Sequence, residues 1–245
     1  MHDKFRYYFY LVGLSVILFA GCRSKRAFTE LTNADEQVDL QQVNIQSPWG
    51  TYKGSSTKDY EIQHVTLDLA IDFDERKVSG KAELILSPLF FDQEVLQLDA
   101  YKLAIKHLKL NNKIWHLFEY DSSQIYIELP QVLSAGEQLV CEIEYEINQF
   151  SIPAQASADN QGGIFLVDYW EGRAAQLWTQ GETAFTCHWY PTIDQPNQRY
   201  TQQISLTVAD SLKTLSNGVL RSQQKKGDGL RKDTWVLDKP HAPYL

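Results

Sequence analysis

The sequence contains few of the residue patterns that mark a self-contained catalytic site. It has 3 cysteines and 6 histidines among 245 residues, and no two histidines lie four positions apart. No cysteine pair has the spacing of a metal-ligand pair, and no G-x-S-x-G sequence is present. Because a helical zinc site needs two histidines on one face with a glutamate beside the first, we expect no metal site and no catalytic residue on this chain.

Basic residues are also scarce. The chain has 31 acidic and 23 basic residues, which gives a formal net charge of −8. Nucleic-acid binding needs clustered Lys and Arg, so this balance argues against a nucleic-acid partner. The one dense basic run outside the N-terminus, residues 221–226, is interpreted as a solvated turn between strands. Carboxylates are plentiful, but their spacing pairs no two of them for glycoside hydrolysis.

A long apolar run is found only near the N-terminus. Lys4 and Arg6 precede an uncharged stretch at residues 7–21, which as a helix would span about 22 Å, less than the roughly 30 Å of a bilayer core. We therefore expect residues 1–21 to be a cleaved signal peptide. The ending Leu18-Phe19-Ala20-Gly21-Cys22 resembles a bacterial lipobox, although Phe19 departs from the usual Leu.

This resemblance implies export and acylation of Cys22, which would anchor the chain to a bacterial membrane on its periplasmic face or at the cell surface. An ordinary signal peptide followed by an incidental cysteine is the alternative. Cys141 lies on the apolar face of a predicted strand, so we expect it to be a buried free thiol. A disulfide between Cys141 and Cys187 remains open, because an exported compartment would permit it.

The mature chain is predicted to be a flexible tether followed by one all-β domain. Residues 22–58 are polar and lack apolar periodicity. From residue 59 onward, apolar residues alternate with polar ones in short runs separated by turns. The predicted strands are residues 65–71, 78–86, 96–100, 125–129, 139–147, 164–167, 204–208 and 235–237. This pattern predicts a large curved β-sheet or a β-sandwich over residues 59–245.

Four short sequences in the second half are more specific than the pattern of strands. The chain reads W-T-Q-G-E at residues 178–182, H-W-Y-P-T-I-D-Q-P-N-Q-R at 188–199, L-S-N-G at 215–218 and D-K-P-H-A-P-Y-L at 238–245. In this order and spacing they resemble the N-terminal domain of the M1 zinc aminopeptidases, and the resemblance covers residues 58–245. Gln195 and Thr192 depart from the residues that are common in the family, Glu and Cys respectively.

The resemblance implies a role in binding the N-terminus of a peptide substrate. The Gln and Glu of the family motif correspond to Gln180 and Glu182 in this sequence. By this resemblance, Glu182 would bind the protonated α-amine of the substrate, and Gln180 would line the pocket for the first side chain. The catalytic zinc and its ligands belong to the family's catalytic domain, and neither G-x-M-E-N nor H-E-x-x-H occurs in this sequence. The chain alone is therefore expected to be inactive.

Two alternatives remain open at this point. The chain could be a non-enzymatic surface lipoprotein that uses the β domain as a binding or scaffolding module, with 6 Trp and 13 Tyr available for contacts. It could also be one half of a split enzyme whose zinc-bearing domain is a separate partner chain.

Overall fold

The computed structural model describes residues 46–47, 50–51, 57–151, 162–167 and 175–245. The chain divides into two compact units, Met1–Ser56 and Thr57–Leu245. Within the first unit, β1 (Gln46–Ser47) pairs with β2 (Gly50–Thr51). The predicted signal peptide, Cys22 and most of the predicted tether lie outside the described residues. The described part of the chain has no helix long and apolar enough to cross a membrane.

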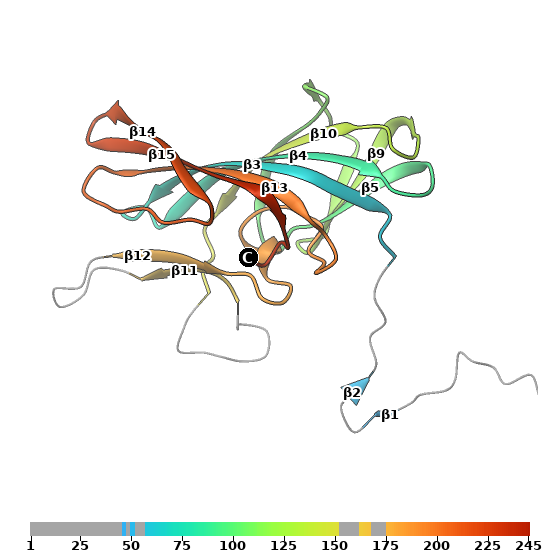
Figure 1. Cartoon of the computed structure of the whole chain (residues 1–245), viewed down its shortest axis with the longest axis horizontal. Coiled ribbons are helices and arrows are strands. Elements are labelled where there is room, and N and C mark those ends of the chain that lie inside the picture. Colours follow the sequence, from blue (N-terminus) through green and yellow to red (C-terminus); the bar gives the residue numbers. More distant parts are fainter. Residues whose placement is uncertain (1–45, 48–49, 52–56, 152–161, 168–174) are drawn as a thin grey trace, which may run out of the picture. The chain divides into compact units, whose positions relative to one another are not determined.

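The second unit is built on an eight-stranded sheet (Figure 1). Its strands, in spatial order, are β14 (Val219–Gly227), β15 (Leu230–His241), β13 (Tyr200–Ala209), β3 (Tyr60–Asp72), β4 (Lys77–Pro88), β10 (Leu139–Ile147), β6 (Ala104–Leu110) and β7 (Lys113–Ile114). β13 runs parallel to β3, and the other neighbouring pairs of this sheet are antiparallel.

The apolar alternation of the sequence explains the central hairpin. In β3 the side chains of Val65, Leu67 and Leu69 are buried and alternate with less buried residues. In β4 the register places Leu84 opposite Val65 and Ala82 opposite Leu67. Because successive residues of a strand point to opposite faces, this register gathers the apolar set on one face.

A second layer closes the core under one half of this sheet. The strands β5 (Gln93–Asp99), β9 (Gln124–Leu133) and β8 (Phe118–Tyr120) form a three-stranded sheet. Leu96 and Leu98 of β5 and Ile125 and Ile127 of β9 are fully buried in the same core cluster as Leu84. The remaining pair, β11 (Gly163–Val167) and β12 (Gln176–Gln180), forms a hairpin of its own that lies below the large sheet in Figure 1.

The predicted all-β fold is confirmed, and two details of the prediction are wrong. Residues 221–226 belong to β14 rather than to a turn. This edge strand is exposed along most of its length, so its charges occupy solvent-facing strand positions, where Lys and Arg also discourage pairing with other chains. The strand expected at 235–237 is the middle of the longer β15. Residues 164–167, predicted as a strand, belong to β11, which pairs with β12 apart from the large sheet.

His188 ends a short 3-10 helix, η1 (Thr186–His188). His64 and His107 lie in strands. Cys141 is a buried free thiol, and burial raises its pKa to about 12. Cys187 is also free, so the two cysteines form no disulfide in this structure.

Candidate functional site

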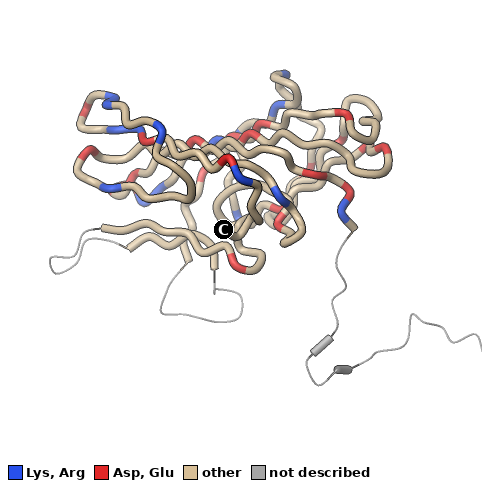
Figure 2. The backbone as a smooth tube through the Cα atoms, viewed as in Figure 1, with Lys and Arg blue, Asp and Glu red and all other residues tan. Residues whose placement is uncertain are grey.

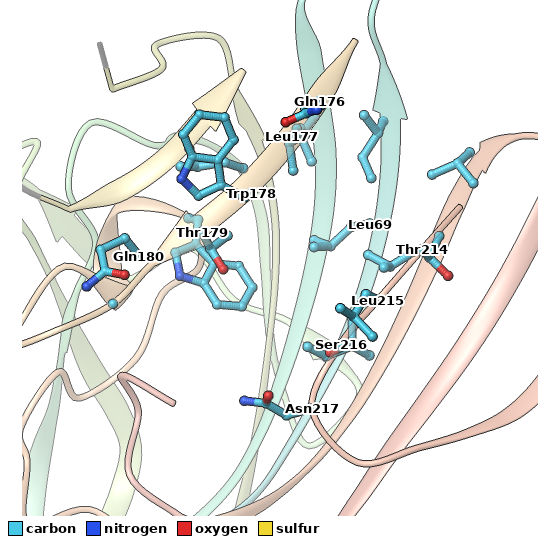
Figure 3. A pocket seen from close by; sticks show the side chains of 18 of the residues that line it. Leu69, Gln176, Leu177, Trp178, Thr179, Gln180, Thr214, Leu215, Ser216 and Asn217 are labelled. Atoms are coloured by element: carbon cyan, nitrogen blue, oxygen red, sulfur yellow. The ribbon is translucent and has the colours of Figure 1, made fainter. Parts of the chain in front are cut away.

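A pocket of about 930 Å³ lies between the β11–β12 hairpin and the large sheet. Figure 3 shows β12 on one side of it and residues 214–217 on the other. Leu69, Ile204 and Leu206 of the large sheet contribute apolar side chains, and Pro243, Tyr244 and Leu245 complete the lining. Its volume falls within the range of about 300–1,000 Å³ that is typical of small-ligand sites.

The chemistry of this pocket is mainly apolar, with polar groups on opposite sides. Lys213 is the one charged side chain among the described lining residues, while Gln180 and Asn217 supply amides. The described parts of β11 and β12 carry no charged residue, and Figure 2 shows the hairpin free of blue and red. Trp189 also lines the pocket, and its buried indole Nε1–H has no hydrogen-bond acceptor among the described residues. The pocket therefore suits an apolar group with a few polar atoms.

The turn after β12 carries the two residues that the resemblance singled out. Gln180 ends β12, lines the pocket and is exposed. Glu182 is exposed and is not among the residues lining the pocket; no described residue donates a hydrogen bond to its carboxylate. The buried Gly181 between them lies against the C-terminal segment, since a Cβ added there would be 2.8 Å from the Cα atom of Tyr244. Glycine is required here by close backbone approach.

Two further glycines, at the start of β11, lie close to side chains that follow this turn. A Cβ on Gly162 would overlap the ring of Phe185, and a Cβ on Gly163 would be 3.0 Å from the His188 side chain. The His188 ring stacks on Tyr101 with 4.3 Å between centroids and meets the edge of Phe185. Burial, with a smaller contribution from the charge of Lys102, lowers the pKa of His188 to about 4, so the imidazole is neutral at neutral pH. His188 therefore acts as a neutral aromatic ring that packs between Tyr101 and Phe185.

Asp194 holds the segment that contains Cys187 and His188 through hydrogen bonds. Its Oδ2 accepts a hydrogen bond from the Cys187 backbone N–H at 2.9 Å, and its own N–H donates to Asp99 Oδ2 at 2.8 Å. The backbones of Asp99 and Thr192 exchange two further bonds of 2.7 and 3.0 Å. Burial raises the pKa of Asp194 to about 6. Burial and the neighbouring Asp194 raise the pKa of Cys187, so its thiol stays protonated and is no candidate nucleophile.

Comparison with known proteins shows to which family the chain belongs. Residues 56–245 match the family model described as the peptidase M1 N-terminal domain. The chain belongs to this family. It is also similar to the probable aminopeptidase 1 of Saccharolobus solfataricus, with 26% identity over 164 residues that cover 66% of this chain and 18% of that protein. The chain thus spans about a fifth of the length of this curated relative.

Solved structures share the fold. An M1 zinc metallopeptidase from Deinococcus radiodurans, solved with a Tyr-Ser-Ala substrate, superposes with a TM-score of 0.65 and 19% identity, covering 79% of this chain and 42% of that one. Aminopeptidase A of Legionella pneumophila, in complex with aspartic acid, gives a TM-score of 0.62 and 21% identity over 79% of this chain and 21% of that one. These superpositions show that the chain shares its fold with parts of both proteins.

The family motifs prove to be a mixture of pocket-lining and supporting residues. Gln180, Ser216 and Asn217 line the pocket from different sides. The buried Gln198 instead bonds the backbones of Ile62 and Tyr60 at 3.1 and 2.8 Å, which secures the start of β3. Described residues provide no group of three His, Cys, Asp or Glu that could hold a metal ion.

Sequence reasoning missed the apolar floor of the pocket. Leu69, Ile204 and Leu206 lie within the predicted strands 65–71 and 204–208, and alternation predicts only that apolar residues share one face of a strand. Alternation carries no signal for whether a second layer covers that face.

Proposed function

We propose that this chain is the part of a zinc-dependent aminopeptidase that holds the N-terminus of a peptide substrate. Glu182 binds the protonated α-amine, and Gln180 lines the pocket that receives the first side chain. The observation that supports this most strongly is the Glu182 carboxylate, which is exposed and has no partner among the described residues, beside a pocket of about 930 Å³.

The supports around this carboxylate favour a binding role over an ordinary surface turn. Gly181 packs on Tyr244, while the Phe185 N–H donates to the Gly181 carbonyl oxygen at 2.9 Å. A turn held at several points loses little conformational entropy when a ligand binds. A carboxylate carried by such a turn forms a charge-assisted hydrogen bond with an ammonium group, whereas an N-acylated peptide offers no cation. This difference would give selectivity for free N-termini.

The zinc and the hydrolytic step are proposed to belong to a separate domain or a partner chain. The described residues offer no ligand set for a metal, so no step of hydrolysis is assigned to them. The residues of this chain would hold and orient the substrate, and bound zinc would activate the attacking water. We expect the purified chain to hydrolyse no aminoacyl chromogenic substrate, even with added zinc. Zinc-dependent turnover by the purified chain would contradict this division of labour.

The role of Glu182 is tested in the longer protein that contains the zinc-bearing domain. Replacing Glu182 by Gln removes the charge and keeps the size, so kcat/KM for an aminoacyl p-nitroanilide should fall roughly 30- to 150-fold, the equivalent of about 2–3 kcal/mol. Zinc content should not change. Glu182→Asp is the matched control and should retain more activity than the Gln variant. An unchanged kcat/KM in Glu182→Gln would refute the proposed amine contact.

We further propose that the protein is exported and anchored through acyl chains on Cys22. The support is the uncharged segment at residues 7–21 with the lipobox-like ending Leu18-Phe19-Ala20-Gly21-Cys22. Mass spectrometry of the N-terminal peptide of the mature protein should find a diacylglyceryl group on Cys22. An unmodified Cys22, or a mature N-terminus at another residue, would count against the anchor while leaving the proposed role of Glu182 untouched.

A further inference from the structure

Two neighbouring phenylalanines are exposed at one end of the large sheet. Phe90 and Phe91 lie in the turn between β4 and β5, and 69% and 72% of their surfaces are accessible. Val95 of β5 and Val132 of β9, two strands that pair next to this turn, are also exposed, with 44% and 48% accessible. These four residues make up the aromatic end of the sheet. Isolated apolar residues are common on protein surfaces, but two adjacent exposed aromatic side chains beside further apolar ones indicate a binding surface.

The backbone around the aromatic end is held on both sides. The Leu89 N–H donates to the Asp59 carbonyl oxygen at 2.8 Å, and the Gly136 N–H donates to the Pro88 carbonyl oxygen at 2.8 Å. The Asp92 side chain accepts a hydrogen bond of 3.0 Å from the Ala135 N–H. The turn therefore presents its two rings from a fixed backbone, and little conformational freedom remains to be lost on binding.

The position of this turn in the chain suggests its partner. The bond between Leu89 and Asp59 places the turn beside the residues at which the chain from Cys22 joins the folded unit. In Figure 1 the turn between β4 and β5 lies at the same end of the sheet as the start of β3. Tyr244 and Leu245 instead line the pocket, to which no residue of the turn contributes. The aromatic end thus adjoins the first residues of the folded unit, and its turn is not part of the lining of the proposed substrate pocket.

We propose that the aromatic end inserts into the lipid surface to which Cys22 is anchored. This inference rests on the proposed acylation for its proximity to a membrane. Aromatic and aliphatic side chains gain free energy when they enter the boundary between headgroups and acyl chains. The exposed charges next to the turn include Asp92, Glu94 and Glu137. Acidic neighbours do not attract anionic headgroups, so the contact should be apolar and insensitive to salt.

The test uses the full acylated chain in phosphatidylcholine vesicles, with a specific protease site inserted within residues 23–45. After cleavage, vesicle flotation measures how much of the folded unit stays on the lipid without its anchor. We expect part of the wild-type unit to remain bound in both low and high salt. The double variant Phe90→Ser, Phe91→Ser should reduce the partition coefficient at least about tenfold. The matched control is Val219→Ser, Leu220→Ser in β14, which replaces two other exposed apolar residues and should leave binding unchanged.

A second measurement identifies the partner and separates the two proposals. A photo-crosslinking phenylalanine analogue at position 91 should form lipid adducts in cells, whereas the same analogue at position 219 should not. Crosslinks from position 91 to protein only, or to nothing, would overturn the inference, as would complete release of the wild-type unit after cleavage. Circular dichroism checks that each variant is folded. If Cys22 proves acylated and the aromatic end fails these tests, the anchor stands and only the inference is lost.

Discussion

The two halves of the large sheet are covered in different ways. Under β4 and β10, the strands β5, β8 and β9 form a closed layer, and Leu84, Leu98 and Ile127 are completely buried. Under β13 and the ends of β3 and β4, the β11–β12 hairpin leaves a pocket of about 930 Å³ lined by Leu69, Ile204 and Leu206. One sheet with one alternating pattern therefore supports a sealed core and an open site.

The two halves also differ in what holds them together. The sealed half relies on apolar contacts that fill its interior. The segment beside the pocket relies on close backbone approach at Gly181 and on the hydrogen bond that the Cys187 backbone N–H donates to Asp194. Apolar packing tolerates conservative exchange, whereas a glycine contact and a buried carboxylate do not. The open half should therefore be the one whose function is lost through small substitutions.

The largest effect is expected in the sealed half. Leu98→Ala removes a fully buried side chain and should lower the free energy of unfolding by about 3 kcal/mol. Leu215→Ala at the edge of the pocket is the matched control, because Leu215 is 87% exposed and its loss should cost less than about 0.5 kcal/mol. Urea unfolding measures both. Equal costs would mean that the two halves are not packed as differently as described.

The second expected effect is a pH dependence that comes from Asp194. Burial raises its pKa to about 6, so the folded chain keeps this proton where the unfolded chain, with a pKa near 4, has lost it. Stability from this group therefore falls as the pH rises from about 4 to about 6, by up to about 3 kcal/mol. Asp194→Asn should abolish that slope in urea unfolding measured across this range.

Asp233 provides the control of opposite sign. It is fully buried, and Arg231, bonded to it at 2.8 and 2.9 Å, lowers its pKa. Its contribution is present above the ordinary pKa of an aspartate and is lost as the pH falls through its lowered value. Asp233→Asn should thus remove a gain in stability with rising pH. The assigned environments would be contradicted if the two substitutions changed the pH dependence of stability in the same direction.

A smaller effect on stability, with a specific structural signature, is expected at Gly181. In Gly181→Ala the new Cβ would crowd the backbone of Tyr244, and either the turn or the C-terminal segment must shift, at a cost of about 1–2 kcal/mol. Amide chemical shifts of residues 181–185 should change. Gly227→Ala is the control: its φ of +90° makes alanine unfavourable by about 1–2 kcal/mol, but no other atom lies within 4 Å. The control should leave those shifts in place.

The sequence predicted the central strands better than the supports of the site. Residues 65–71 and 78–86 alternate regularly, and β3 and β4 contain them with that alternation intact. β14 was missed because an edge strand exposed on both faces carries no apolar period. The contact of Gly181 with Tyr244 joins residues far apart in the sequence, so no local pattern could have revealed it. Gln180 and Glu182 came only from resemblance to a family.

The central claim is that the Glu182 carboxylate binds a cationic amine, and titration of the ¹⁵N-labelled chain with phenylalanine amide tests it most directly. The account predicts saturable shifts of the Gly181 and Thr183 amide signals, no response to N-acetylphenylalanine amide, and at least about tenfold weaker binding in Glu182→Gln. Equal responses to the free and acetylated ligands, or unchanged binding in Glu182→Gln, would contradict it.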